Sequence, residues 1–208
     1  MMYPPNLHQE LNYENAVLTM KEFPLATVIS VKNNEPVITH MPLVYQENAD
    51  LGSLIGHIDK NNKHYELLDN QYVDVVFHGP DCYISPTYYS TKQLPTWNYV
   101  KVHVKGKATL IKDKNSVMDS LIEMNDFLEE PGGFELNKEN EKMNHFIKYI
   151  QGFAIEITAW EGKFKLSQDK LKKDLEGAKQ ALIRKTTKGC TAYIEQVYSK
   201  HKNKLKDS

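Results

Sequence analysis

The stretch from Trp97 to Ile111 limits the possible folds most, because apolar and polar residues alternate along it. Val100, Val102 and Val104 alternate with lysine and histidine residues, which is the period of a strand with one buried and one solvated face. Gly106 interrupts the alternation and indicates a bulge or a barrel corner. A strand of this kind must bury its apolar face against other strands or helices.

Other short strand patterns lie on both sides of this stretch, with turn signals between them. We expect strands at 25–31, 37–45, 52–58, 72–78, 82–84 and 152–161, and helices at 12–23, 60–68, 115–129, 139–150 and from 169 onward. Short turns, rather than helices, join most of the seven strands. This arrangement predicts a mainly β protein with attached helices, an antiparallel barrel or sandwich and not a doubly wound sheet.

The composition is that of an ordinary globular protein, with 40% hydrophobic residues, 25% charged residues and a net charge of -1. No apolar run approaches the ~20 residues of a membrane span. The first residues also lack the pattern of a secretory signal. We therefore expect a cytoplasmic protein with no membrane partner. Cys82 and Cys190 are far apart, which favours two reduced thiols over a disulfide or a zinc site.

Nucleotide-binding and hydrolase motifs are missing from the sequence. It contains no GxGxxG, GxxxxGK[ST], GxSxG or HExxH pattern. Four histidines fall in expected strands and could converge on a metal or haem: His40, His57, His78 and His103. Hydrogen-bonded strand histidines are the preferred interpretation, and we predict no metal site and no catalytic residue.

Basic residues are concentrated toward the C-terminus. Residues 163–208 contain 13 basic and 5 acidic residues, whereas the rest of the chain contains 13 and 22. Such asymmetry marks either a polyanion-binding tail or the solvated face of a helix, and we favour the helix face. We expect one barrel domain over residues 1–165, with residues 166–208 as a basic helical extension packed on the same domain.

The segment from Gly56 to Lys63 joins an expected strand end to an expected helix start. Free N–H groups at a helix start, together with Lys60 and Lys63, suit a phosphate group. Asn61 and Asn62 add amide donors. Ordinary helix capping is the alternative interpretation.

Two aromatic and polar runs add further candidates. Trp97 opens the longest strand, where an indole ring can flank a planar ligand. Lys163 and Lys165 follow the last strand and project to one side in extended geometry, within reach of an anion. A packed aromatic ring and solvent-facing lysines are the alternatives.

Five sequence blocks follow one another in order over most of residues 3–185. They are THMPL at 39–43, GHIDKNN at 56–62, GPDCYISP at 79–86, PTWNYVKVH at 95–103 and EGKFKLSQ at 161–168. In order and spacing these blocks resemble the PaiB family of FMN-binding negative transcriptional regulators.

The resemblance implies a flavin split β-barrel that forms a homodimer with FMN at the subunit interface. It assigns Thr39 and His40 to the strand that lines the flavin. It also implies the following contacts: His57 and Ile58 to the ring or ribityl chain, Lys60, Asn61 and Asn62 to the phosphate, and Trp97 and Asn98 from the partner subunit. Lys163, Lys165 and Ser167 belong to a family signature without an assigned role.

Two functions stay open at this point. The resemblance implies a repressor of degradative-enzyme and sporulation genes. Direct DNA contact through the basic C-terminal region is possible, although the sequence has no helix-turn-helix signature. The alternative is a flavin oxidoreductase of the pyridoxamine-phosphate-oxidase-like or nitroreductase-like class that acts on a small molecule.

Overall fold

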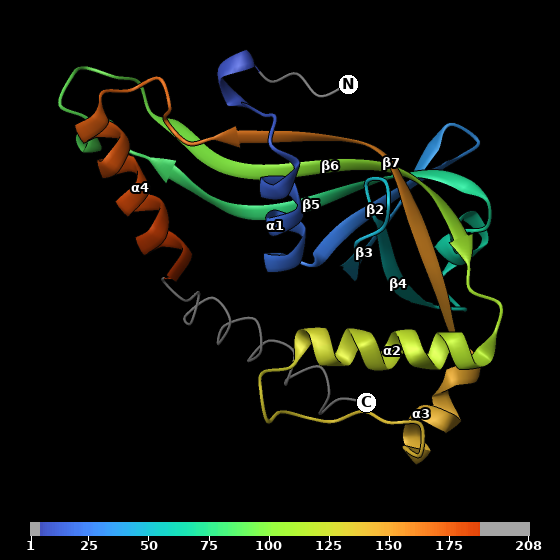
Figure 1. Ribbon diagram of the computed structural model, residues 1–208. Helices are drawn as coiled ribbons and strands as arrows, with labels where there is room; N and C mark the ends of the chain where they lie inside the picture. Colours follow the sequence, from blue (N-terminus) through green and yellow to red (C-terminus); the bar gives the residue numbers. More distant parts are fainter. Residues whose placement is uncertain (1–4, 188–208) are drawn as a thin grey trace, which may run out of the picture. The chain divides into compact units, whose positions relative to one another are not determined.

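The computed structural model describes residues 5–187 and confirms a mainly antiparallel β fold with attached helices (Figure 1). The strands are β1 (Gln9–Glu10), β2 (Leu25–Lys32), β3 (Glu35–Gln46), β4 (Ser53–Asp59), β5 (Gln71–Ile84), β6 (Thr96–Leu110) and β7 (Ile150–Lys165). The α-helices are α1 (Tyr13–Glu22), α2 (Lys114–Leu128), α3 (Glu141–Phe146) and α4 (Lys172–Thr187). Short 3-10 helices are η1 (Asn6–His8), η2 (Lys63–Leu67), η3 (Pro86–Tyr88) and η4 (Ile147–Tyr149).

Six of the strands close into a barrel. The sheet order is β1-β7-β4-β3-β2-β5-β6, and β6 also pairs with β7. The ring β7-β4-β3-β2-β5-β6 therefore returns to its first strand, which removes the exposed edges that an open sheet would have. β1 pairs with β7 as an additional strand, with Gln9 opposite Lys163.

The barrel interior is an apolar core built from the inward residues of the strands. Leu43, Leu54, Phe77 and Phe153 are fully buried there, and Val102 joins them from the alternating stretch of β6. Burial of a side chain of this kind contributes about 1.5–3 kcal/mol relative to leaving it exposed. The valine alternation that predicted a half-buried strand therefore places its apolar face in this core.

The chain divides into two compact units. The first consists of Met1–Gly79 and Val100–Lys165, and the second of Pro80–Tyr99 and Leu166–Ser208. The second unit has its own small core, in which Cys82, Ile84 and Tyr89 pack against Ala178 and Ala181 of α4. Packing of the expected C-terminal extension on the barrel stays a prediction, and its residues 188–208 lie outside the described part of the chain.

Asparagine residues mark the start of α1 and the turn between β2 and β3. The Asn12 side chain accepts a hydrogen bond from Glu14 N at 2.9 Å and caps α1. Asn33 and Asn34 both have positive φ, at 53° and 64°, which suits the two-residue turn between β2 and β3.

The two strands expected at 72–78 and 82–84 are one strand, because β5 continues through Gly79-Pro80 to Ile84. A Cβ at Gly79 would lie only 2.9 Å from Val100 Cβ, so this glycine permits close approach of β6 instead of forming a turn.

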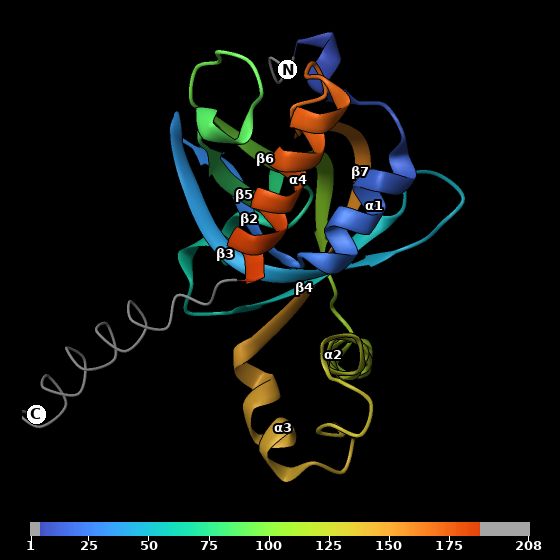
Figure 2. The same cartoon turned by 90° about the vertical axis from the view of Figure 1, so that its left-hand side faces the viewer.

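Helices α2 and α3 lie together on one side of the barrel in the first unit. Figure 2 shows α2 end-on, with α3 beside it, and the contacts of α2 are with β4, β7 and η4. α2 begins at the Asp113 cap, whose carboxylate accepts from Ser116 N at 2.8 Å. No helix within residues 5–187 has the length and apolar character that a membrane span requires.

Gly106 provides a test of barrel closure. Its missing side chain allows β6 to approach β7, since an added Cβ would contact Ile155 and lie 2.6 Å from Glu156 O. We expect Gly106→Ala to lower the free energy of unfolding by about 1–3 kcal/mol in urea denaturation. Lys107→Ala, at the exposed neighbouring position, should change it by less than about 0.5 kcal/mol. Equal stability of both variants would contradict this closure.

Candidate functional site

The β3–β4 ladder is short and leaves an open seam in the barrel wall. β3 pairs with β2 over all eight positions from Glu35 to Pro42, but with β4 only over the four positions from Leu43 to Gln46. The end of β4, residues 57–59, pairs with β7 alone. We call the gap between residues 36–42 of β3 and residues 57–59 of β4 the seam.

Pro42 explains where the seam begins. Leu43 N donates to Pro24 O at 2.9 Å, on the β2 side, and N–H groups alternate in direction along a strand. The nitrogen of Pro42 therefore faces β4, and it has no proton to donate. By the same alternation, the N–H groups of Ile38 and His40 point into the seam, where the described ladder gives them no β4 partner.

Thr39 and Asn62 meet at one end of the seam. Asn62 Nδ2 lies 3.4 Å from Thr39 Oγ1, and the Asn62 side chain also accepts from His64 N at 3.0 Å. The fully buried His64 ring bonds Thr39 Oγ1 at 2.9 Å and Ser30 Oγ at 2.8 Å. Burial lowers the pKa of His64, so the ring is a neutral connector between two hydroxyl groups.

His40 lies on the outer face of the barrel beside the seam. Thr27 Oγ1 lies 2.9 Å from His40 Nδ1 and 2.9 Å from His78 Nε2, so one hydroxyl joins two exposed histidines of neighbouring strands. This accounts for two of the four strand histidines. Within residues 5–187 no group of three or more His, Cys, Asp or Glu side chains is arranged to hold a metal ion.

His57 lies on the opposite side of the seam, beneath α2. Ser120 Oγ donates to Val117 O at 2.9 Å, so it accepts from His57 Nε2 at 2.8 Å. Nδ1 of His57 is then an acceptor, and it is buried without a hydrogen-bond partner in the described chain. Burial lowers the pKa of His57 to about 4, which keeps the ring neutral at neutral pH. An unsatisfied buried acceptor costs about 1–3 kcal/mol unless a ligand or water completes it.

The remaining residues of the 57–62 segment point in different directions. Ile58 is 4% exposed and belongs to the barrel core. Lys60 turns away from Thr39, with its Nζ 3.0 Å from Lys148 O. Asn61 is exposed and donates to Asp59 Oδ1 through both N and Nδ2. These residues therefore do not converge on a single point.

The helix expected from Lys60 is also shorter than predicted. The segment forms only the five-residue 3-10 helix η2, which begins at Lys63. A single short turn does not supply the aligned dipole of a longer helix. The long helix start that suggested a phosphate site is therefore absent, whereas the phosphate contacts of Lys60, Asn61 and Asn62 stay a prediction.

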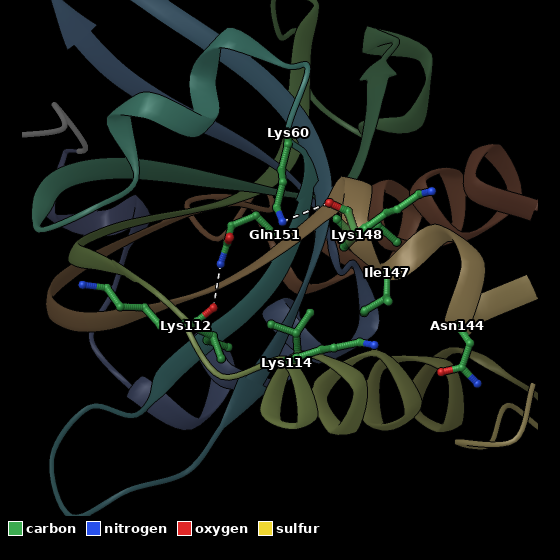
Figure 3. A pocket seen from close by; sticks show the side chains of 10 residues that line it. Lys60, Lys112, Lys114, Asn144, Ile147, Lys148 and Gln151 are labelled. Atoms are coloured by element: carbon green, nitrogen blue, oxygen red, sulfur yellow. Dashed lines mark hydrogen bonds between the residues drawn. The ribbon is translucent and has the colours of Figure 1, made fainter.

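Lys60 contributes to a separate cavity of about 390 Å³ (Figure 3). Its walls come from Lys60 after β4, from the β6–α2 connection and the start of α2, and from α3, η4 and the start of β7. The lining includes four lysines: Lys60, Lys112, Lys114 and Lys148. Of these four lysines, only Lys60 is among the residues that the sequence predicted to bind the cofactor.

Three more residues that were predicted to bind the cofactor contact other residues of the protein: Trp97, Asn98 and Ser167. Trp97 is 54% exposed and meets Tyr83 edge-on, whereas Asn98 is 1% exposed. Ser167 Oγ donates to Asn98 Oδ1 at 3.1 Å and lies 2.9 Å from Tyr89 Oη. This buried chain of hydrogen bonds lies within the second unit.

The two signature lysines lie at the end of β7 in the first unit. Lys163 and Lys165 are half-buried, and each has an interaction partner.

Three residues of these histidine hydrogen bonds were not predicted from the sequence: Thr27, Ser30 and His64. Thr27 and Ser30 lie in an apolar run, and His64 fell inside an expected helix. The strand pairing, which sets Thr27 opposite His40, is the signal that could have indicated the role of Thr27.

Two solved structures define the class of fold. They are the FAD and Heme binding protein from Mycobacterium smegmatis (17% identity, TM-score 0.62, covering 81% of this chain and 79% of that chain) and the flavocytochrome Anf3 from Azotobacter vinelandii (18%, 0.61, 78% and 72%). At these identities the likeness shows the fold alone. The fold is a split β-barrel, as the sequence predicted.

The family follows from sequence. Residues 2–159 match the family described as "Putative FMN-binding domain", and the chain belongs to this family. The chain is also 30% identical, over 183 residues, to "Protease synthase and sporulation protein PAI 2" of Bacillus subtilis (strain 168), covering 83% of this chain and 85% of that protein. The resemblance to the PaiB family is thereby confirmed.

His57 predicts an acid-sensitive stability. The folded state holds its pKa near 4, below the ordinary 6.5, so the unfolded chain binds the extra proton between these values. Stability is therefore unaffected above about pH 6.5 and is lost as the pH falls toward 4. We expect His57→Gln to reduce the loss of unfolding free energy between pH 7 and pH 5 by about 1–2 kcal/mol, measured by urea denaturation. His145→Gln, at an exposed position, should leave that loss unchanged. An unaltered pH dependence in His57→Gln would show that His57 titrates normally.

Proposed function

We propose that the chain binds FMN in the seam between β3 and β4 and acts as a PaiB-like negative transcriptional regulator. The observation that carries the proposal is the open ladder, together with membership of the FMN-binding family. Ile38 and His40 offer backbone donors there, and Thr39 and Asn62 offer polar side chains beside them. When bound, FMN supplies a ring that can be oxidised or reduced.

The chemistry of the donor groups fits such a ligand. A flavin ring carries hydrogen-bonding atoms along one edge, and unpaired strand N–H groups are complementary to its acceptors. The unpartnered Nδ1 of His57 is an acceptor on the other side of the seam. The amide group of Asn62 stands beside Thr39 at the end of the seam, where it would meet the phosphate.

The outer surface beside the seam supports a homodimer with the cofactor at the interface. Large apolar side chains from three neighbouring strands are more than half exposed on this face: Leu25, Val31, Ile38 and Tyr72. The pairing of Ile29 with Ile38 and of Thr27 with Val76 places these strands side by side. An exposed apolar face of this kind is typical of a protein interface. Trp97 of a second copy would complete the pocket around the ring.

The regulatory part of the proposal rests on the relative from Bacillus subtilis, whose name refers to protease synthase and sporulation. We propose that FMN-bound dimers repress degradative-enzyme and sporulation genes. Within the described residues, α4 carries five basic and two acidic residues and is the candidate for DNA contact. The rest of the basic tail lies beyond residue 187.

Asn62 provides a direct test of FMN binding. Asn62→Asp keeps the acceptor that caps η2 but places a negative charge where the phosphate is proposed. We expect FMN binding to weaken about tenfold or more in Asn62→Asp, measured by the quenching of flavin fluorescence. Asn137→Asp adds the same charge at an exposed position and should bind FMN as the wild-type protein does. Wild-type protein that stays colourless after incubation with FMN would overturn the proposal.

A second experiment separates regulation from redox catalysis. Salt-dependent retention of promoter DNA by the FMN-loaded protein supports the regulator, and no retention at low salt contradicts it. Bleaching of the bound flavin by NADH or NADPH would instead favour an oxidoreductase that acts on a small molecule.

A further inference from the structure

The cavity that contains Lys60 has an unusual charge. Four of its ten lining residues are lysines, and none is an aspartate or glutamate. In the described part of the chain, no carboxylate lies within 4.0 Å of the ammonium groups of Lys60, Lys112, Lys114 or Lys148. Cations gathered without counter-charges repel one another, and a bound anion would relieve this repulsion.

The lysines divide into an inner pair and a rim. Figure 3 shows Lys60 extending into the cavity from the end of β4, and Lys114 extending across α2 toward Ile147. The ammonium groups of Lys112 and Lys148 point outward, and that of Lys148 lies 4.9 Å from the Tyr149 ring. Lys60 uses one of its three protons on Lys148 O, which fixes its position and leaves two for a ligand.

The amide side chains in the lining are already committed as donors. Gln151 Nε2 donates to Ile111 O at 2.6 Å and to Gly152 O at 2.9 Å. Asn144 Nδ2 donates to Lys138 O at 2.7 Å and to Asn140 O at 3.2 Å. The lysine ammonium groups are therefore the side-chain donors left for a ligand, and they select for negative charge.

The remaining lining residues are branched apolar side chains. Val117 and Ile147 are nearly fully buried, and Ile111 and Ile150 are half-buried beside them. A free inorganic ion would leave this apolar surface without a partner. A ligand that matches both the lysines and the apolar side chains has a charged end and a small apolar body. The cavity volume of about 390 Å³ is at the small end of the range of ligand pockets, which also favours a small ligand.

We propose that this cavity is a second binding site, distinct from the seam, for a small organic phosphate ester. Two ammonium groups match the double charge of a phosphate ester, which favours it over a singly charged carboxylate. The direction of Lys60 separates the two sites, because its Nζ bonds η4 while Asn62 turns to Thr39 in the seam. A ligand here would contact α2 through Val117, one turn before the Ser120 that holds His57. The site is thus placed to report a metabolite to the flavin region.

Phenyl phosphate is a suitable probe, since it carries the dianion on a small apolar ring. We expect the FMN-saturated protein to bind it in isothermal titration calorimetry, with weaker binding of benzoate and of inorganic phosphate. The variant Lys112→Ala/Lys114→Ala should bind phenyl phosphate about tenfold less tightly or worse. The matched variant Lys107→Ala/Lys172→Ala removes the same charge at exposed positions outside the cavity and should bind it within about twofold of wild type.

The flavin absorbance of the same samples distinguishes the two sites. Retention of FMN throughout the titration, and by the Lys112→Ala/Lys114→Ala variant, supports a separate site. Release of FMN by phenyl phosphate would show that the cavity is part of the flavin site, and it would overturn the proposal. Absence of phenyl phosphate binding to wild type, or equal binding by both double variants, would also overturn it. A failure to bind FMN at all would count against the seam and not against this cavity, which is then titrated in the FMN-free protein.

Discussion

The short ladder between β3 and β4 is the feature on which the rest of the site depends. A barrel wall with complete pairing would leave no backbone donors free, and its only ligand contacts would be side chains. Pro42 ends the pairing because its nitrogen faces β4 without a proton. The ring of strands nevertheless stays closed through β6 and β7. The protein therefore combines an apolar core with an interruption in the wall between β3 and β4, and four of the predicted cofactor residues lie along it: Thr39, His40, His57 and Asn62.

The two sides of the seam differ in how completely their polar side chains are hydrogen-bonded. On the β3 side, His64 is fully buried and joins Thr39 to Ser30, so the hydroxyl groups there have fixed positions. On the β4 side, α2 covers His57 and leaves one of its ring nitrogens unsatisfied. The β3 side is thus preorganised for a ligand, whereas the β4 side carries an unfulfilled acceptor. A polar group that is buried and unpaired in this way is a common feature of a binding site.

The sequence predicted those features that depend on local chemistry. The valine alternation before Gly106 predicted the half-buried β6. The turn expected between strands 25–31 and 37–45 is formed by Asn33 and Asn34. The separation of 72–78 from 82–84 into two strands was wrong, because Gly79, which admits a neighbouring strand, has the same local signature as a turn glycine.

Features that depend on strand register could not be predicted. The order of the strands around the barrel brings Thr27 to His40 and carries Lys60 to η4, and no spacing along the chain indicates either contact. The blocks that resemble the PaiB family identified the right family, but closeness in sequence gives no direction for the side chains of His57, Lys60 and Asn62. In the fold these three side chains face α2, η4 and β3 respectively.

Hydrogen exchange of the backbone amides in β3, followed by NMR with and without FMN, tests the central claim most directly. If FMN binds in the seam, the N–H groups of Ile38 and His40 exchange more slowly in its presence, while those of Thr39 and Met41, which face β2, change little. Unchanged exchange at Ile38 and His40 in protein that is saturated with FMN would contradict the account and would place the flavin elsewhere on the molecule.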